Sequence, residues 1–282
     1  MDRFRTEIDA RPAPFDLPHS QPIVMLGSCF TDNVGTLLNR DGFDVMHNPL
    51  GPLYNPASLL RAVELALGIG EPTIIQEASG AWHCLDFASR YSDPDHQRLM
   101  EKVYADLQAL GYALHTATTL IITLGTSFVF SLVDGPIVGN CHKFPVQTFT
   151  RYRLSTEENA LCLRKILSIL PANIQHVIFT VSPIRHVGDG LHANQLSKAA
   201  LLLAIDQIIA VNDIANYFPA YELVLDDLRD YRFYAADMKH PSDVAVEYIY
   251  EKFVQTYFSP ATTAAALAAR KQSLRAAHRP IL

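Results

Sequence analysis

The chain has little that would tie it to a nucleic acid or a membrane. Its 23 Lys and Arg residues are scattered and outnumbered by 29 Asp and Glu residues, which gives a formal net charge of −6. Without a basic stripe, we expect no nucleic-acid partner. No apolar run approaches the roughly 20 residues that span a bilayer, and the first residues lack the apolar core of a signal peptide. We therefore expect a cytoplasmic protein with no membrane partner, in an oligomeric state that the sequence leaves open.

Patterns typical of metal, redox and nucleotide sites are also missing. The four cysteines form no CxxC pair, which argues against a zinc knuckle or a thioredoxin-like motif. No HExxH string occurs, and the spacing of His186 and His192 in a glycine-containing loop is weak support for a metal. No GxGxxG or Walker string is present. We expect free thiols, no metal and no nucleotide cofactor.

Apolar, β-rich runs alternate with helical patterns, which is typical of an α/β fold with a mostly parallel sheet between helices. The composition, 49% apolar and 18% charged, is ordinary for a globular protein. We predict a single domain over residues 1–282. It includes a Pro-rich N-terminal arm (1–22), an Ala-rich C-terminal tail (259–282), and inserted loops with a hairpin.

The expected elements follow from these patterns. The predicted strands of the sheet are 23–27, 43–46, 118–124, 176–181 and 221–225. The predicted helices cover about 30–39, 57–67, 94–115, 155–170, 194–211 and 241–257, the last with Pro241 as its first residue. Smaller β elements are expected at 73–87 and in a hairpin of 127–132 with 136–138.

Polar clusters stand where several predicted strands end, and ligand sites of parallel sheets lie beyond the carboxyl ends of the strands. Ser28 lies between a strand and a helix, where its hydroxyl would be exposed and its own N–H could stabilise an oxyanion. Gly27 permits the tight turn. The alternative is that Ser28 only caps the helix.

A serine nucleophile needs a base, and His240 is the leading candidate among eleven histidines. Asp237, three residues earlier, could accept the other imidazole N–H and fix the tautomer. The alternative is that both residues form a capping turn before Pro241.

Several short segments follow one another along the chain: Gly27-Ser28-Cys29-Phe30-Thr31, Asn48-Pro49-Leu50-Gly51-Pro52-Leu53-Tyr54-Asn55-Pro56, Thr123-Leu124-Gly125-Thr126, Asn140-Cys141-His142-Lys143, Ser182-Pro183-Ile184-Arg185-His186, Asn194-Gln195-Leu196-Ser197-Lys198, Tyr217-Phe218-Pro219-Ala220-Tyr221-Glu222 and Asp237-Met238-Lys239-His240-Pro241. Together they resemble the GSCFA family of the SGNH, or GDSL-like, hydrolase superfamily, over a stretch from Gly27 to about Phe253. The fifth residue of the first motif is usually alanine in the family and is threonine here. The resemblance implies a flavodoxin-like three-layer sandwich, the SGNH hydrolase fold.

The resemblance implies a Ser28 nucleophile with Asp237 and His240 as its dyad. The oxyanion donors that it implies are the backbone N–H groups of Ser28 and Gly51. At the third donor position Ser127 replaces the asparagine of the superfamily. Loss of one such donor can cost on the order of 100-fold in rate.

The Ser127 hydroxyl could donate instead, or Asn55 or Asn48 could supply the missing donor, and the sequence leaves this choice open. Cys29 is intrinsically a better nucleophile than its neighbour, but adjacent side chains at a helix start point about 100° apart. With Ser28 outward, Cys29 is expected to be buried against the sheet. The predicted substrate contacts are Asn48, Gly125, Thr126, His142, Lys143, Arg185 and His186.

The resulting prediction is a serine hydrolase that cleaves an acyl ester of a small molecule or carbohydrate, for example an O-acetyl group on a sugar. An acyltransferase could use the same site with a different acceptor. A non-catalytic ligand-binding protein of the same fold is the third possibility, and the missing oxyanion asparagine favours it.

Overall fold

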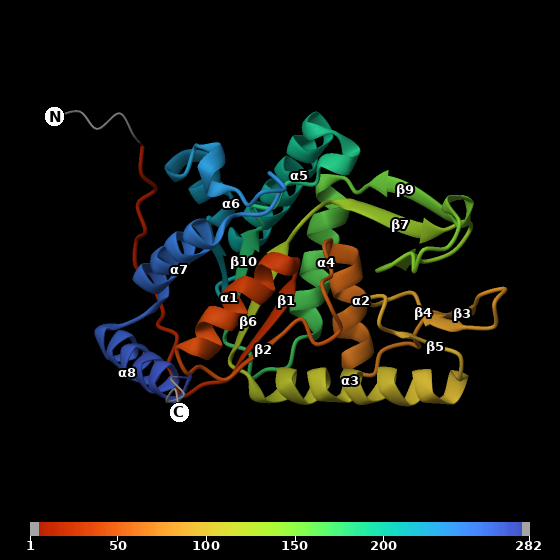
Figure 1. Cartoon of the computed structure of the whole chain (residues 1–282), viewed down its shortest axis with the longest axis horizontal. Helices are drawn as coiled ribbons and strands as arrows, with labels where there is room; N and C mark the ends of the chain where they lie inside the picture. Colours follow the sequence, from red (N-terminus) through yellow and green to blue (C-terminus); the bar gives the residue numbers. More distant parts are fainter. Residues whose placement is uncertain (1–5, 278–282) are drawn as a thin grey trace, which may run out of the picture.

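The computed structural model describes residues 6–277 and is built around a five-stranded parallel sheet (Figure 1). The strands are β1 (Ile23–Gly27), β2 (Val45–His47), β6 (Thr119–Leu124), β10 (His176–Val181) and β11 (Ala215–Phe218). Their spatial order is β11-β10-β6-β1-β2. Numbered along the chain, this is the 2-1-3-4-5 order of flavodoxin-like folds, whose direction switches between β1 and β6. The predicted fold class is confirmed.

Helices cover both faces of the sheet and make three layers (Figure 1). One face carries α1 (Cys29–Arg40) and α7 (Asp243–Tyr257), and α8 (Pro260–Ala277) packs against α1. The other face carries α2 (Pro56–Ala66), α3 (His96–Thr116), α4 (Thr156–Ile169) and α5 (Leu191–Ile209). Ser155 and Glu158 form a capping box at the start of α4.

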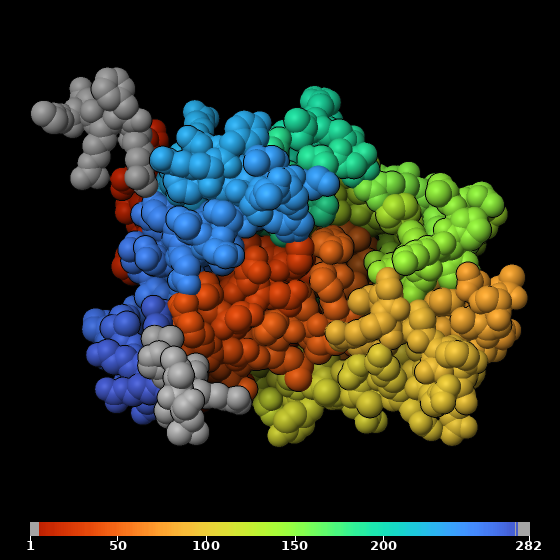
Figure 2. Space-filling model, viewed as in Figure 1, coloured from red at the N-terminus to blue at the C-terminus, as the bar shows by residue number. Residues whose placement is uncertain are grey.

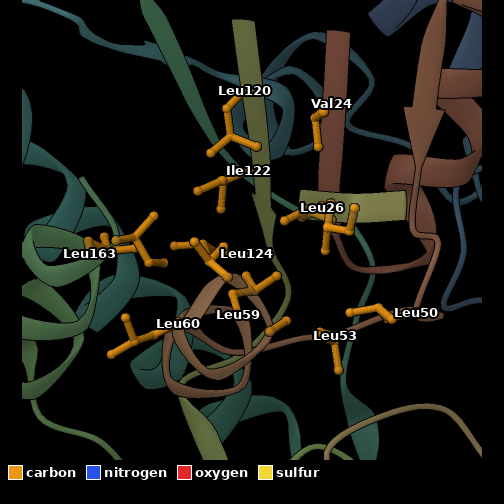
Figure 3. Packing of buried hydrophobic residues seen from close by; sticks show 14 of the residues in the cluster. Val24, Leu26, Leu50, Leu53, Leu59, Leu60, Leu120, Ile122, Leu124 and Leu163 are labelled. Carbon is orange, nitrogen blue, oxygen red and sulfur yellow. The ribbon is translucent and has the colours of Figure 1, made fainter. Parts of the chain in front are cut away.

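The side chains of each central strand pack alternately against the helices on the two faces of the sheet, because successive side chains of a strand point to opposite faces. Val24 and Leu26 of β1 face the α2–α5 side, whereas Ile23 and Met25 face α1 and α7. Figure 3 shows the first of these cores, in which strand residues meet leucines of α2 and α4: Val24, Leu26, Leu120, Ile122 and Leu124 with Leu59, Leu60 and Leu163. The buried sheet is thus the rigid base on which the site stands.

Two small antiparallel sheets extend from one end of the sandwich, side by side (Figures 1 and 2). The first consists of β3 (Ile74–Gln76), β4 (Trp82–Cys84) and β5 (Ser92–Asp93), and the second of β7 (Phe128–Leu132), β8 (Ile137–Val138) and β9 (Phe149–Arg153). The N–H groups of Gly139 and Asn140 join them by donating to the Leu85 carbonyl at 2.8 and 2.9 Å. The predicted hairpin is confirmed, and β9 completes it.

Two predictions near the C-terminus are wrong. Residues 221–225 do not form a strand, because they lie in a helical segment made of α6 (Ala220–Glu222) and the π-helix Leu223–Asp227. A short buried apolar run fits a helix as well as a strand, and the last strand is instead β11. Pro241 does not open α7, whose N-cap is Ser242, and pairs with Tyr234 in a β-bridge.

Within residues 6–277, no helix is long and apolar enough to cross a membrane. The same residues bring together no group of three or more His, Cys, Asp and Glu side chains arranged to hold a metal ion. Of the predicted arm and tail, residues 1–5 and 278–282 lie outside the described part of the chain.

A buried carboxylate ties α8 to the sandwich. Asp41, whose side chain is 1% exposed, accepts hydrogen bonds from Arg270 Nε at 2.7 Å, Tyr250 Oη at 2.9 Å and Arg40 Nε at 3.1 Å. Burial alone would raise the pKa of Asp41, but the bonds from Arg270, Tyr250 and Arg40 outweigh it and lower that pKa. The ionised form is therefore the one that stabilises the fold.

We expect Arg270→Met to lower the free energy of unfolding by about 2 kcal/mol at neutral pH, because it leaves part of a buried charge uncompensated. Asp41 has a lower pKa when folded than when unfolded. Its contribution is therefore present above the unfolded pKa of about 3.9 and is lost as pH falls through the folded pKa. Urea unfolding over a pH series measures both effects, with the exposed Lys271→Met as control. A difference between Arg270→Met and wild type that stays constant into strong acid would contradict this account.

Candidate active site

A cavity of about 570 Å³ opens beyond the carboxyl ends of β1 and β6, at the switch point of the sheet. Cys29 and Thr126 follow these two strands and line it. The start of α2 contributes Tyr54 and Asn55, and the last loop contributes His240. The cavity is therefore built from distant parts of the chain that the parallel sheet brings together.

The turn from β1 into α1 is fixed by close packing on β6. Gly27 has φ +148°, and a Cβ there would lie 2.2 Å from the Thr123 carbonyl oxygen, so only glycine fits. The next residue, Ser28, donates its backbone N–H to the same carbonyl at 3.0 Å. Its hydroxyl accepts the Phe30 N–H at 3.3 Å, which makes Ser28 the N-cap of α1.

Ser28 is fully buried and is not among the residues that line the cavity, whereas Cys29 is. The expectation that Ser28 points outward is therefore wrong, and Cys29, which is partly buried against the core, also reaches the cavity. The two side chains leave the helix start in different directions, and the hydrogen bonds of the cap hold Ser28 inward. Cys29 Sγ lies 3.7 Å from His240 Nε2, so Cys29 is the residue that the fold brings to the histidine.

The predicted contact between Asp237 and His240 is confirmed. His240 Nδ1 donates to Asp237 Oδ2 at 2.6 Å, and Asp237 Oδ1 accepts the backbone N–H groups of Lys239 and His240 at 2.9 and 3.0 Å. The His240 and Lys239 N–H groups, together with the His240 ring, hold the pKa of Asp237 far below its usual range. An ionised Asp237 fixes the proton of the neutral ring on Nδ1, and the lone pair of Nε2 then faces Cys29.

Arg185 holds the loop that presents His240. Its backbone N–H donates to Lys239 O at 3.1 Å, and its guanidinium donates to Met238 O at 3.2 Å. Met238 has φ 56°, an unusual conformation for a non-glycine residue, which these bonds help to maintain. Arg185 also lines the cavity, where a substrate contact was predicted. It therefore both faces the cavity and holds the loop of His240.

The thiol of Cys29 is set for proton transfer to a base. Burial raises the pKa of Cys29, its own backbone N–H and that of Phe30 lower it, Asp32 raises it and Lys198 lowers it, with a net rise. The resting group is thus the neutral thiol, which is a weak nucleophile until a base removes its proton. The adjacent Nε2 of His240 is positioned for that step.

The predicted oxyanion donors are already engaged in other hydrogen bonds. The Ser28 N–H bonds to Thr123 O, and the Gly51 N–H bonds to Asn48 O at 2.8 Å. The Ser127 hydroxyl lies within hydrogen-bonding distance of both oxygens of Ser197, at 3.1 Å from Oγ and 3.3 Å from the carbonyl. These three predictions are therefore wrong for the same physical reason: each group already forms a hydrogen bond with a backbone or side-chain partner.

Asn48 is likewise a brace and does not line the cavity. Its Oδ1 accepts the Gly27 N–H at 2.9 Å, and its Nδ2 donates to Ser28 O at 3.2 Å, with the backbone at φ 40°. It holds the turn that presents Cys29. The predictions of Asn48 as a substrate contact and as an oxyanion donor are wrong in this geometry, since Asn48 does not line the cavity and both ends of its side-chain amide bind the Gly27–Ser28 turn.

Asn55 does have a donor to offer. It is the N-cap of α2, and its Oδ1 accepts the Ser58 N–H at 2.9 Å. In the described part of the chain nothing accepts a hydrogen bond from its Nδ2, and Asn55 lines the cavity. The other candidate donor is the Cys29 N–H at the first position of α1, which has no partner within the helix and interacts with its own thiol.

Of the other predicted substrate contacts, some lie at the cavity and some lie away from it. Thr126 and His186 line the cavity. His186 Nε2 is buried without a hydrogen-bond partner among residues 6–277, and burial, then Lys198, lowers the pKa of His186 to about 4. Gly125 lies beneath, with its carbonyl bound to Lys198. A neutral His186 can therefore offer a hydrogen bond to a ligand.

His142 and Lys143 lie outside the cavity lining, so their prediction as substrate contacts is not supported by the geometry. His142 is 8% exposed, and its ring bonds to Ser92 Oγ at 3.0 Å and to Phe87 O at 3.0 Å, on the β3–β5 sheet. Lys143 is exposed next to it. Both have positive φ, so the tight turn that they form directs them away from the cavity.

Several residues of the cavity were missed from the sequence. Tyr54, whose hydroxyl is within hydrogen-bonding reach of Cys29, belongs to the family-like segment 48–56 but was not predicted as a site residue. Phe128 belongs to the wall formed by β7 and lies below the Arg151 guanidinium at 5.1 Å. Arg151 in turn forms a two-pronged ion pair with Asp189 at 2.8 and 2.6 Å. Their positions depend on the packing of β9, which the sequence did not predict.

Comparison with known proteins gives one sequence family and a set of distantly similar folds. No curated protein sequence matches the chain. A carbohydrate esterase family 2 enzyme with a carbohydrate binding domain from Corynascus thermopiles (Myceliophthora fergusii) is 14% identical and has a TM-score of 0.43, with 90% of this chain and 68% of that chain covered. A family two carbohydrate esterase from Clostridium thermocellum, in complex with cellohexaose, gives 11% identity and a TM-score of 0.40 over 84% and 63%.

An acetyl-xylooligosaccharide esterase mutant from Geobacillus Stearmophilus gives 12% identity and a TM-score of 0.40 over 86% of this chain and 95% of that chain. Similarities at this level are to the architecture of those enzymes and leave the chemistry of this site to its own residues. The GSCFA family model, by contrast, matches residues 22–253, a stretch that includes every residue of the Cys29–His240–Asp237 array. The chain belongs to the GSCFA family.

Proposed function

We propose that this protein hydrolyses acyl esters through a thioester formed on Cys29, with His240 as base and Asp237 as the group that orients it. The observation that carries the proposal is the continuous array from Cys29 Sγ to His240 Nε2 at 3.7 Å and from His240 Nδ1 to Asp237 Oδ2 at 2.6 Å. Nucleophile, base and orienting acid in this order define a triad by geometry, whatever the fold.

In the first half-reaction, His240 Nε2 takes the thiol proton and Cys29 Sγ attacks the ester carbonyl. The carbonyl oxygen becomes an oxyanion, for which the Cys29 N–H and Asn55 Nδ2 are the candidate donors. Collapse of this intermediate breaks the bond between carbonyl carbon and alcohol oxygen. The alcohol leaves with the proton from His240, and the acyl group stays on Cys29.

In the second half-reaction, His240 removes a proton from water, which attacks the thioester and releases the acid and the thiol. The His240 side chain is 46% exposed, so water can reach the acyl-enzyme. This exposure favours hydrolysis over transfer to a second alcohol, because a transferase must exclude water from the intermediate.

For the substrate we propose an O-acylated sugar with a small acyl group. The cavity of about 570 Å³ mixes aromatic side chains such as Tyr54 and Phe128 with hydrogen-bonding groups such as Asn140 and His186. Such a mixture suits a ring with apolar faces and polar edges. Release of acetate from acetylated sugars by the purified protein tests this, and activity only on esters without a sugar would contradict it.

Asn55 gives a test of the oxyanion site. Asn55→Ser keeps an oxygen that caps α2 but removes the Nδ2 donor, so we expect kcat to fall on the order of 100-fold with little change in Tm. Hydrolysis of p-nitrophenyl acetate measures the rate, and a thermal melt measures stability. Asn55→Ala, which loses both cap and donor, should show the same fall in rate with an added loss of stability. Wild-type kcat in Asn55→Ser would remove Asn55 from the oxyanion site.

A further inference from the structure

Lys198, on α5, is buried in a way that its packing alone does not explain. The residue is 1% exposed, and its Nζ donates to the carbonyl oxygens of Gly125 at 2.6 Å and Ser182 at 2.7 Å. The Tyr221 ring lies 5.5 Å from Lys198 Nζ. Over residues 6–277, no carboxylate forms an ion pair with it. An ammonium buried without a counter-ion costs several kcal/mol, and an apolar side chain would avoid that cost.

The two carbonyl groups place Lys198 directly under the proposed site. Gly125 follows β6 and Ser182 follows β10, so both carbonyls stand at the carboxyl edge of the sheet. Thr126 comes immediately after the first, and the segment that contains His186 comes shortly after the second; both residues line the cavity. Lys198 thus joins two adjacent strand ends below the cavity floor.

We propose that the ammonium of Lys198 stabilises, from beneath the floor, the negative charge that develops on Cys29 Sγ and on the acyl oxyanion. This inference rests on the proposed role of Cys29. Lys198 does not touch the reacting atoms, so it acts through its electric field and as a positioning residue for the strand ends. In the low-dielectric interior such a field is screened far less than at the surface.

The charged groups around the site agree with this role. Asp32, on α1 beside Cys29, disfavours the thiolate, and Lys198 favours it. Around Lys198 itself are His186, which is kept neutral, and the neutral Tyr221. Burial lowers the pKa of Lys198 to about 7, and a thiolate at Cys29 raises it. By reciprocity, a protonated Lys198 must lower the pKa of Cys29.

Two variants separate the charge from the hydrogen bonds. Lys198→Met removes both, whereas Lys198→Gln removes the charge but keeps an NH₂ group that can donate twice. The readout is the pH dependence of Cys29 alkylation by iodoacetamide, which is uncharged, followed by mass spectrometry of the Cys29 peptide. We expect alkylation at pH 6 to slow by up to about tenfold in both variants, as for a unit charge at about 10 Å and an effective dielectric constant of about 20, and the difference to shrink as pH rises through about 7, where Lys198 loses its proton. Exposed Lys165→Met is the matched control and should be alkylated at the wild-type rate.

A wild-type alkylation rate at pH 6 in Lys198→Gln would overturn the proposal, because it would show that hydrogen bonding is the whole contribution of Lys198. Lys198→Gln also decides the question if Lys198→Met does not fold. The experiment follows alkylation and not turnover, so it remains interpretable if Cys29 is not the nucleophile. That failure would appear separately, as ester hydrolysis that survives complete alkylation of Cys29 in the wild type.

Discussion

Cys29→Ala should abolish ester hydrolysis, with a fall in kcat/KM of at least about 10³-fold, while Ser28→Ala should keep it within about tenfold. The reason is geometric: Cys29 Sγ meets His240 Nε2 at 3.7 Å, whereas Ser28 is fully buried as the cap of α1. Loss of the cap should cost Ser28→Ala about 1 kcal/mol of stability. Initial rates with p-nitrophenyl acetate and thermal melts of both variants measure these effects.

Cys29→Ser sharpens the comparison, because a hydroxyl in the same place is a much weaker nucleophile at its ordinary pKa. We expect residual hydrolysis in Cys29→Ser and no sensitivity to iodoacetamide. Cys162→Ser, at a half-buried cysteine of α4, is the control for a general effect of losing a thiol. Full activity in Cys29→Ala together with loss of activity in a folded Ser28→Ala would return the nucleophile to Ser28.

Asp237→Asn should lower kcat/KM by about 10² to 10⁴-fold with little change in the fold. An asparagine keeps the oxygen that accepts the N–H groups of Lys239 and His240, but its NH₂ group cannot accept the proton of His240 Nδ1. The ring would then favour the tautomer with its proton on Nε2, which cannot take the proton of Cys29. Asp226→Asn, at a surface carboxylate, should be neutral and serves as the control.

The pH dependence adds a check on the same residue. Hydrogen bonds from the His240 and Lys239 N–H groups and from the His240 ring keep the pKa of Asp237 far below its usual range. Asp237 therefore stays ionised through mildly acidic pH, and any loss of rate there should come from other groups. An unchanged kcat/KM in a correctly folded Asp237→Asn would show that Asp237 does not orient the base.

Much of the fold could be predicted because its signals are local. Continuous apolar runs such as 118–124 and 176–181 are typical of strands buried on both faces, and their alternation with helices fixes a parallel sheet. The run 221–225 is also mostly apolar, with one glutamate, but lies in a helical segment. Periodicity does not separate short buried helices from strands, so tertiary packing decides there.

The place of the site and the contact between Asp237 and His240 could be predicted, but not which side chain faces His240. Asp237 and His240 are three residues apart, so their contact follows from a single turn. The side chain that faces His240 depends on the residue at which α1 begins, because successive side chains of a helix point about 100° apart. The start of α1 is fixed by two long-range hydrogen bonds, from the Ser28 N–H to Thr123 O and from Asn48 Nδ2 to Ser28 O, which no local pattern reveals.

The oxyanion donors show the same limit. The Gly51 N–H and the Ser127 hydroxyl could donate to an oxyanion, but the first already donates to Asn48 O and the second already bonds to Ser197. Asn55 is left available because its oxygen, and not its nitrogen, caps α2. A donor can bind an oxyanion only if no neighbouring group already accepts its hydrogen bond, and this follows only from three-dimensional packing.

The most direct measurement is the identity of the acylated atom during turnover. The protein is mixed with p-nitrophenyl acetate, quenched in acid within the first turnover and digested, and the peptide that contains Ser28 and Cys29 is fragmented in the mass spectrometer. We predict an acetyl group on Cys29 that neutral hydroxylamine removes, as it does from thioesters. An acetyl group on Ser28 that resists hydroxylamine would contradict the account.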